Sequence, residues 1–163
     1  MRIVAALLLS VLLTGCGWQL RGAAMMGLSG VPIAVEAEEA SGEFVQDLRA
    51  ALRGAGANLV PRAAAAAVVI LEDDIVHRRS LAVTTRAVSR EYELEYLLRY
   101  RVETPDGEWL TGSEPVSRVR SYRYDAAEAL AGEARGTQLR GELRAEVVRA
   151  VVLRVQALVG HQE

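Results

Sequence analysis

The chain has 163 residues, a length that suits one domain with a substantial hydrophobic core. Its formal net charge is −2, so the overall charge gives no reason to expect a nucleic-acid-binding protein. All 19 basic residues are arginine, which is the better bidentate partner for phosphate and carboxylate groups. The single cysteine excludes an internal disulfide.

The first residues have the pattern of an export signal. Met1-Arg2 provides a positive start, and Ile3–Leu13 is an almost unbroken apolar run, shorter than the ~20 residues needed to span a bilayer. The run ends in Leu13-Thr14-Gly15-Cys16, the lipobox pattern of bacterial lipoproteins. We therefore predict that a signal peptide at residues 1–15 is removed and that Cys16 is acylated. An ordinary secretory signal with a chance cysteine is the alternative.

Residues 16–30 are predicted to form a lipidated tether. Gly17, rather than Asp, follows the cysteine, and under the usual lipoprotein sorting pattern this predicts the outer membrane. Several acyl chains would hold the protein there almost permanently, since each buried CH₂ contributes about 0.8 kcal/mol. The segment is rich in small residues but carries Trp18, Leu20 and Met25. It is therefore either a flexible linker or a segment that lies along a partner.

The next stretch predicts a strand and a helix. Val31–Glu36 alternates between apolar and other residues, as a short strand does. Apolar residues then repeat at helical spacing from Phe44 to Ala55, with Ser41 as a plausible N-cap and Gly54 as a stop signal. This helix has its charged residues on the outer side.

A buried strand follows this helix. Val68–Leu71 has the β-branched, apolar composition of such a strand. We expect it to run to Val76 and the chain to turn near His77–Ser80. Leu81–Val88 would then lead into the next strand.

The longest regular feature is a hairpin. From Glu91 to Glu103 charged and apolar residues alternate, which predicts one long strand with a charged and an apolar face. Thr104-Pro105-Asp106-Gly107 supplies a turn, and a second extended run, Trp109–Tyr124, returns beside the first. Pro115 favours a bulge or an edge position for the second strand, because proline cannot donate to a ladder.

Two helical segments are predicted after the hairpin. Asp125–Glu128 resembles a capping box and would begin a short helix that ends at Gly132. A final helix from about Gln138 to Val159 carries an apolar stripe. The order of elements predicts an α+β fold, a two-layer sandwich of two main helices on a mostly antiparallel sheet of about four strands. Residues 31–163 would form this single domain.

Nothing in the sequence predicts catalysis, a cofactor or a metal site. The only histidines, His77 and His161, are far apart and have no carboxylates at ligand spacing. Asp73 and Asp74 are adjacent on a strand and would point to opposite faces. No nucleophile elbow or phosphate-binding glycine loop is present. We predict that the protein is not an enzyme, and a periplasmic hydrolase is the alternative.

Arginine clusters are the stronger indication of binding. Arg86 and Arg90 flank the start of the long strand, and Arg135 follows the short helix. Arginines at the ends of elements suit phosphorylated lipids. Three more lie on the second strand of the hairpin: Arg118, Arg120 and Arg123. For any one of them, pairing with a carboxylate of the long strand is an equally good interpretation.

Three segments together with the final helix resemble the LptE family of lipopolysaccharide-assembly lipoproteins. The segments are Leu13–Gly22, Ser89–Leu94 and Val119–Asp125, and the helix begins with Gln138–Leu143. The resemblance extends over almost the whole chain and keeps the order of its elements. It implies a two-helix, four-stranded sandwich that plugs the LptD β-barrel, supports the assembly of that barrel and binds lipopolysaccharide during its insertion into the outer leaflet.

The resemblance also implies a location and a set of contacts. The protein would be lipid-anchored at the outer membrane, facing the periplasm and lying within a barrel lumen, whose polar interior suits a polar exterior. Arg86, Arg90 and Arg135 are the candidates for lipopolysaccharide contacts. A basic residue that some relatives carry falls near Gly132 here. An accessory lipoprotein of an ABC-type or phospholipid transport system is the alternative function.

Overall fold

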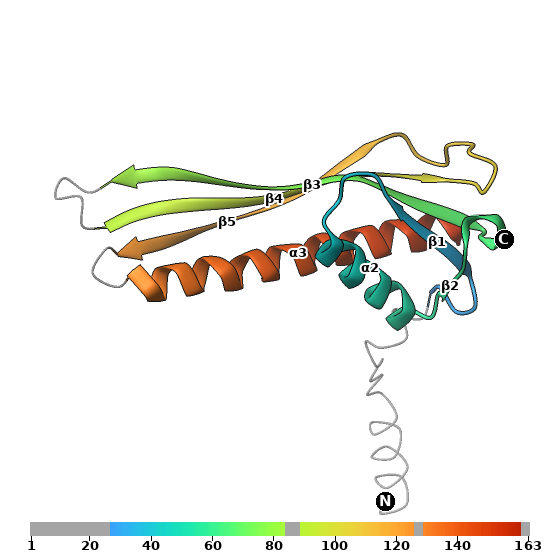
Figure 1. Ribbon diagram of the computed structural model, residues 1–163, viewed down its shortest axis with the longest axis horizontal. Helices are drawn as coiled ribbons and strands as arrows, with labels where there is room; N and C mark the ends of the chain where they lie inside the picture. Colours follow the sequence, from blue (N-terminus) through green and yellow to red (C-terminus); the bar gives the residue numbers. More distant parts are fainter. Residues whose placement is uncertain (1–26, 84–88, 126–128, 161–163) are drawn as a thin grey trace, which may run out of the picture.

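The computed structural model describes residues 27–83, 89–125 and 129–160 (Figure 1). Cys16, Arg86 and the proposed capping box at 125–128, apart from the backbone of Asp125, lie outside the described residues. In chain order the elements are β1 (Pro32–Ala37), α2 (Gly42–Gly54), β2 (Asn58–Leu59), the 3₁₀ helix η2 (Arg62–Ala64), β3 (Ala67–Val83), β4 (Ser89–Glu103), β5 (Glu114–Asp125) and α3 (Ala129–Val159).

The elements form two layers, a five-stranded sheet in the order β2-β1-β3-β4-β5 and two helices on one side of it (Figure 1). The strands β3, β4 and β5 are antiparallel neighbours, whereas β1 runs parallel to both β2 and β3. The α+β sandwich predicted from the sequence is confirmed. The sheet is mixed because the connection from β1 to β3 crosses over through α2, which brings the two strands into the same direction.

The helix α2 forms where its sequence signals predict it. The Ser41 side chain caps its first turn by accepting a hydrogen bond from the Phe44 amide at 3.3 Å. After Gly54 the chain turns through Gly56, whose φ of +92° is a conformation that favours glycine. The helix buries one face, which consists of Phe44, Leu48 and Leu52.

The strand β3 is longer than predicted. It continues to Val83 without a turn at His77–Ser80, and its pairing with β4 extends to Val83 opposite Arg90. His77–Ser80 is exposed, so its polar residues mark a solvated part of a long ribbon rather than a turn. Asp73 and Asp74 therefore lie inside β3 rather than at its end.

The hairpin of β4 and β5 follows the predicted alternation. One face of β4 is buried and consists of Leu94, Tyr96, Leu98, Tyr100 and Val102. The strand β5 begins at Glu114, later than the predicted Trp109. Before Glu114, the returning segment pairs with β4 through an isolated bridge between Trp109 and Glu103. Pro115 fits because β5 is the edge strand of the sheet.

The C-terminal part is one helix of 31 residues rather than two helical segments. The predicted break at Gly132 is wrong, since α3 continues through it. Gly132 is buried, and a Cβ atom at this position would lie 2.5 Å from Cδ2 of Tyr124. The glycine therefore allows the helix to approach the sheet closely rather than ending it.

A single core fills the space between the layers. Its members with 2% exposure or less include Leu48 and Phe44 from α2, Leu143, Val147 and Val151 from α3, and Tyr96, Leu98 and Tyr100 from β4. Each such side chain contributes about 1.5–3 kcal/mol on burial. Burial, ahead of the nearby Glu114 carboxylate, raises the pKa of Tyr100 to about 12, so this core tyrosine stays neutral. Among the described helices, none combines the length and the apolar character needed to cross a membrane.

Candidate functional site

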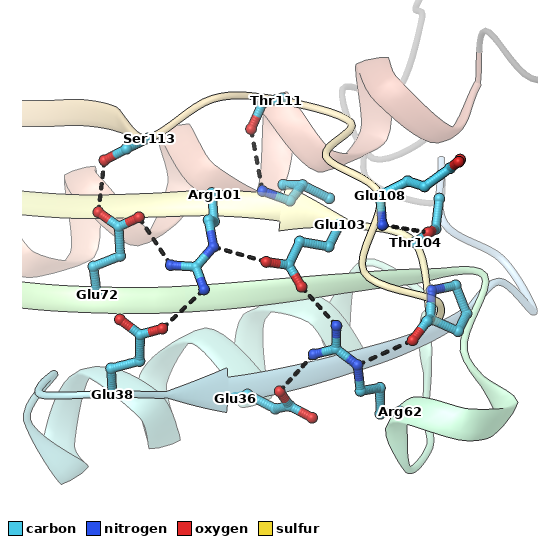
Figure 2. Close-up of polar contacts among 12 residues, drawn as sticks. Glu36, Glu38, Arg62, Glu72, Arg101, Glu103, Thr104, Glu108, Thr111 and Ser113 are labelled. Atoms are coloured by element: carbon cyan, nitrogen blue, oxygen red, sulfur yellow. Dashed lines mark hydrogen bonds and ion pairs between the residues drawn. The ribbon is translucent and has the colours of Figure 1, made fainter.

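Two regions of the molecule are rich in arginine. The first, which we call the arginine clamp, consists of Arg62 and Arg101 with the carboxylates of Glu36, Glu38, Glu72 and Glu103 (Figure 2). The second, which we call the distal end, is where β3 and β5 end and β4 and α3 begin, at the left of Figure 1. The arginines at or near the distal end are Arg78, Arg79, Arg90, Arg123 and Arg135.

Arg101 is the centre of the arginine clamp. It lies on the face of β4 opposite the helices, and its nitrogens contact Glu38 at 2.8 Å, Glu72 at 3.0 Å and Glu103 at 2.8 Å (Figure 2). Ser113, which precedes β5, donates to the second oxygen of Glu72 at 2.6 Å. One guanidinium thus connects three strands, because Glu38 directly follows β1 and Glu72 lies in β3.

Arg62 extends the clamp to the turn of the hairpin. Its nitrogens contact Glu36 at 2.8 Å and Glu103 at 2.6 Å, and Nε donates to the Pro105 carbonyl at 3.1 Å. The segment around η2 therefore covers this face of the sheet, where it also buries a small apolar cluster of Ala34, Ala65, Val68 and Ile70. The clamp holds this cover in place.

The protonation states of the clamp follow from these contacts. Hydrogen bonds from Arg101 and then Arg62 lower the pKa of Glu103, whose side chain is only 7% exposed. Burial alone would raise the pKa of Glu72, but hydrogen bonds from Ser113 and Arg101 outweigh it and the pKa is lowered. Hydrogen bonds to Glu38 and Glu103 raise the pKa of Arg101. Two guanidinium groups are shared among four carboxylates, so both clamp arginines already have internal partners and neither is free for an anionic ligand.

At the distal end, aromatic rings lie between the sheet and the start of α3. The Tyr92 ring centroid is 5.8 Å from that of Tyr122 and 5.9 Å from that of Tyr124. Arg78 lies over Tyr92, with its guanidinium carbon 5.0 Å from the ring centroid, and is 3.8 Å from Glu133 of α3. Its pKa is raised, first by the hydrogen bond with Tyr122. The cation–π and ring contacts therefore join β3, β4 and β5 to one another, and the Arg78–Glu133 pair connects this cluster to α3.

Two glycines of α3 make this contact possible. Besides Gly132 against Tyr124, a Cβ atom at Gly136 would lie 3.1 Å from the hydroxyl oxygen of Tyr122. The space at Gly132 is thus filled by packing in this chain. A long side chain at Gly132 would displace the Tyr124 ring.

Two arginines at this end of the molecule remain available. Arg123 on β5 and Arg135 on α3 are exposed, and no carboxylate in the described residues pairs with either of them. Arg135 borders a shallow hollow of about 250 Å³ together with Gln138, Leu139 and Glu142. Charges of this kind can contact a ligand without losing an internal partner.

The structure brings two of the predicted contact residues to the same end of the molecule. Arg90 lies opposite Tyr124 in the pairing of β4 with β5, and Tyr124 packs on Gly132, about one helical turn before Arg135. The side chain of Arg90 lies outside the described set. Arg118 and Arg120 instead pair with Glu146 of α3, at 3.9 and 2.8 Å. Their role is therefore to hold β5 to the helix.

Sequence reasoning missed both Arg78 and the clamp. Arg78 falls where a turn was predicted, and because His77–Ser80 are all polar, no period-two pattern marks this part of β3. Arg62 and Glu103 are 41 positions apart, and no local pattern indicates such a pair. Within the described ranges, no group of three His, Cys, Asp or Glu side chains could hold a metal ion.

Comparison with known proteins gives a family and a fold. The sequence profile of the LptE family, described as lipopolysaccharide-assembly, matches residues 30–155. No curated protein sequence matches this chain. A solution NMR structure of lipoprotein B from Nitrosomonas europaea is similar, with a TM-score of 0.72 and 20% identity over 88% of this chain and 93% of that one.

Two crystal structures show the same architecture. The rare lipoprotein B from Shewanella oneidensis has a TM-score of 0.67 and 23% identity over 80% of this chain and 97% of that one. A minor lipoprotein from Acinetobacter baumannii has a TM-score of 0.67 and 18% identity over 80% of this chain and 93% of that one. At these identities the likeness establishes the fold alone.

Proposed function

This chain belongs to the LptE lipopolysaccharide-assembly family, and from that premise we propose that it is a non-enzymatic lipoprotein that plugs the LptD β-barrel and binds lipopolysaccharide at its distal end. Acyl chains on Cys16 anchor it to the outer membrane on the periplasmic side. The observation that supports the binding step is the exposure of Arg123 and Arg135 without a described carboxylate partner.

The chemistry of the ligand matches these side chains. Lipopolysaccharide carries phosphate groups, and a guanidinium binds phosphate through two parallel hydrogen bonds. Arg90 is opposite Tyr124 in the sheet, and Tyr124 packs against α3 near Arg135, so both arginines belong to the same end of the molecule. By its place in the sequence, Arg86 belongs to the connection between β3 and β4. We assign the contacts to Arg86, Arg90 and Arg135, with Arg123 as a further contact on β5.

The shape and surface of the domain support the plug. The ribbon of β3, β4 and β5 with α3 along it makes an elongated body that extends away from α2 (Figure 1). Its helix-free face carries mainly polar residues, among them His77, Arg79, Glu95, Ser117 and Ser121. The interior of a large outer-membrane barrel is itself polar, so such a body fits a lumen better than it fits lipid.

Site-specific crosslinking in cells tests the binding step. A photo-reactive amino acid in place of Arg123 or Arg135 should give adducts with lipopolysaccharide, because both side chains are exposed at or near the distal end, Arg135 on α3 and Arg123 on the helix-free face of the sheet. Arg53, which is exposed at the end of α2, is the matched control position and should give none. Equal labelling from all three positions, or none from Arg123 and Arg135, would contradict the assignment.

Purification from detergent-solubilised envelopes tests the plug. A tagged chain should bring down one large β-barrel in a constant ratio. Recovery of an inner-membrane ABC-type complex in its place, with surface lipopolysaccharide unchanged on depletion, would favour the accessory-lipoprotein alternative. Turnover of a substrate by the purified chain would contradict the non-enzymatic assignment.

A further inference from the structure

A groove of about 520 Å³ lies between α2 and α3. Its α2 wall contains Ala50, Ala51 and Gly54, and its α3 wall contains Ala145, Val152 and Leu153. Several lining residues on both helices have small side chains, which do not fill the space between the helices, so the hollow stays open. Leu153 is 57% exposed at its edge, a large apolar side chain with incomplete cover.

The described chain begins at the rim of this groove. Leu28 is fully buried, and its amide donates to the carbonyl of Ala55, a residue that lines the groove, at 3.3 Å. The preceding Gly27 lies against Gln156, whose Nε2 would be 3.4 Å from a Cβ atom there, and Gln156 is another lining residue. Gly27, the first described residue, therefore lies beside this hollow, whose lining is mainly apolar but includes Asp47 and Arg149.

The residues that precede this point have a matching composition. Residues 17–26 include the large apolar side chains Trp18, Leu20, Met25 and Met26, and Arg21 is their only charged residue. The α3 wall from Ala145 to Gln156 is about 16 Å long at 1.5 Å per residue. Ten extended residues reach about 33 Å, so the segment can follow the groove and still leave slack.

We propose that residues 17–26 dock in the α2–α3 groove of their own domain. Attachment at the rim gives the segment a high effective concentration there, which favours it over a separate partner. Removal of Trp18 and the methionines from water supplies the driving force. Docking would place Cys16, and with it the acyl chains, beside the helix layer rather than at the end of a free tether.

The two tryptophans allow a direct test in the chain from residue 16 onward. The reporter protein carries Cys16→Ser, so that no lipid shields the segment, and Trp109→Phe, which leaves Trp18 as its sole tryptophan. Docking should shift the Trp18 emission to shorter wavelength and protect it from acrylamide. Leu153→Glu, at a side chain 57% exposed, should shift the emission back and restore quenching. Leu130→Glu, at a side chain 90% exposed elsewhere on α3, is the matched control and should change neither.

Thermal unfolding keeps the proposal testable if the groove variant loses stability for another reason. Trp18→Ala and Leu153→Glu should each lower the melting temperature, and their combination should lower it by less than the sum, because both remove the same contact. Full additivity would overturn the proposal. So would an emission maximum of exposed tryptophan in the reporter protein, or shielding that increases with protein concentration, which would indicate a second copy in the groove.

Discussion

The arginine clamp and the distal end use the same side chain in opposite ways. Arg101 contacts three carboxylates and Arg62 contacts two, whereas Arg123 and Arg135 contact none in the described residues. The clamp side chains are held between strands, with Arg101 18% exposed and Glu103 7% exposed. Those of Arg123 and Arg135 are exposed to solvent. The number of arginines in a region thus says little about binding until their partners are known.

The difference has an energetic reason. A charge removed from water must be matched by hydrogen bonds and opposite charge, so the covered members of the clamp, Arg101, Glu72 and Glu103, depend on their partners. An exposed guanidinium keeps its hydration and needs no internal partner, which leaves it free for a ligand. The first two experiments below weaken the clamp, and the third disturbs the packing of the distal end.

Loss of the central clamp arginine should have the largest effect. Arg101→Met leaves Glu72 without its ion-pair partner and Glu103 with Arg62 alone, and it should lower the free energy of unfolding by about 3 kcal/mol. Urea denaturation measures this. Arg99→Met, on the same strand but exposed and without a described ion pair, should stay within about 0.5 kcal/mol of the parent. Equal losses from the two variants would remove the distinction between clamp and surface arginines.

Acid should weaken the clamp next. The pKa values of Glu72 and Glu103 are lowered in the folded state, so their stabilisation is complete above the ordinary value of 4.5 and is lost as the pH falls through the lowered values. The free energy of unfolding should therefore fall from pH 5 toward pH 3. In Glu103→Gln the fall over this range should be smaller. An unchanged pH dependence in that variant would show that other carboxylates are responsible.

A methyl group on a glycine of α3 should have the smallest effect and should reveal how the distal end is held. Gly132→Ala gains helix propensity but forces its Cβ into the Tyr124 ring, for a net loss of about 1 kcal/mol. Gly141→Ala has open space around it and should gain up to about 1 kcal/mol. Thermal unfolding compares the two. A gain in both variants would show that the ring moves aside without cost.

The sequence was most informative where one local rule governed one element. The period-two alternation of β4, the Ser41 cap and glycine end of α2, and the edge position of Pro115 were all predicted and are confirmed. Two of the errors have one cause, since polar residues at His77–Ser80 and a glycine at 132 usually interrupt elements. Here a partner strand and the ring of Tyr124, which are brought close only by the fold, overrode the local preference.

The candidate contacts were predictable as residues but not as a site. Arg135 and Arg90 were named from the sequence, but their shared location was not. It depends on Tyr124, which is opposite Arg90 in the sheet and packs against α3, the helix that carries Arg135. Arg118 and Arg120 looked equivalent to Arg123 along the chain. Glu146 separates them, because it lies under that part of β5 and pairs with both.

By itself the sequence determined the main strands and helices, their order and the faces they bury, though not all of their ends, because hydrophobic spacing and caps act over a few residues. It also carried the family resemblance that the profile match confirms. The tertiary structure alone decided which charges are neutralised and which are free. Ion pairs form between side chains up to 101 positions apart, as in Arg144 with Glu43, and only the folded chain brings such groups within reach.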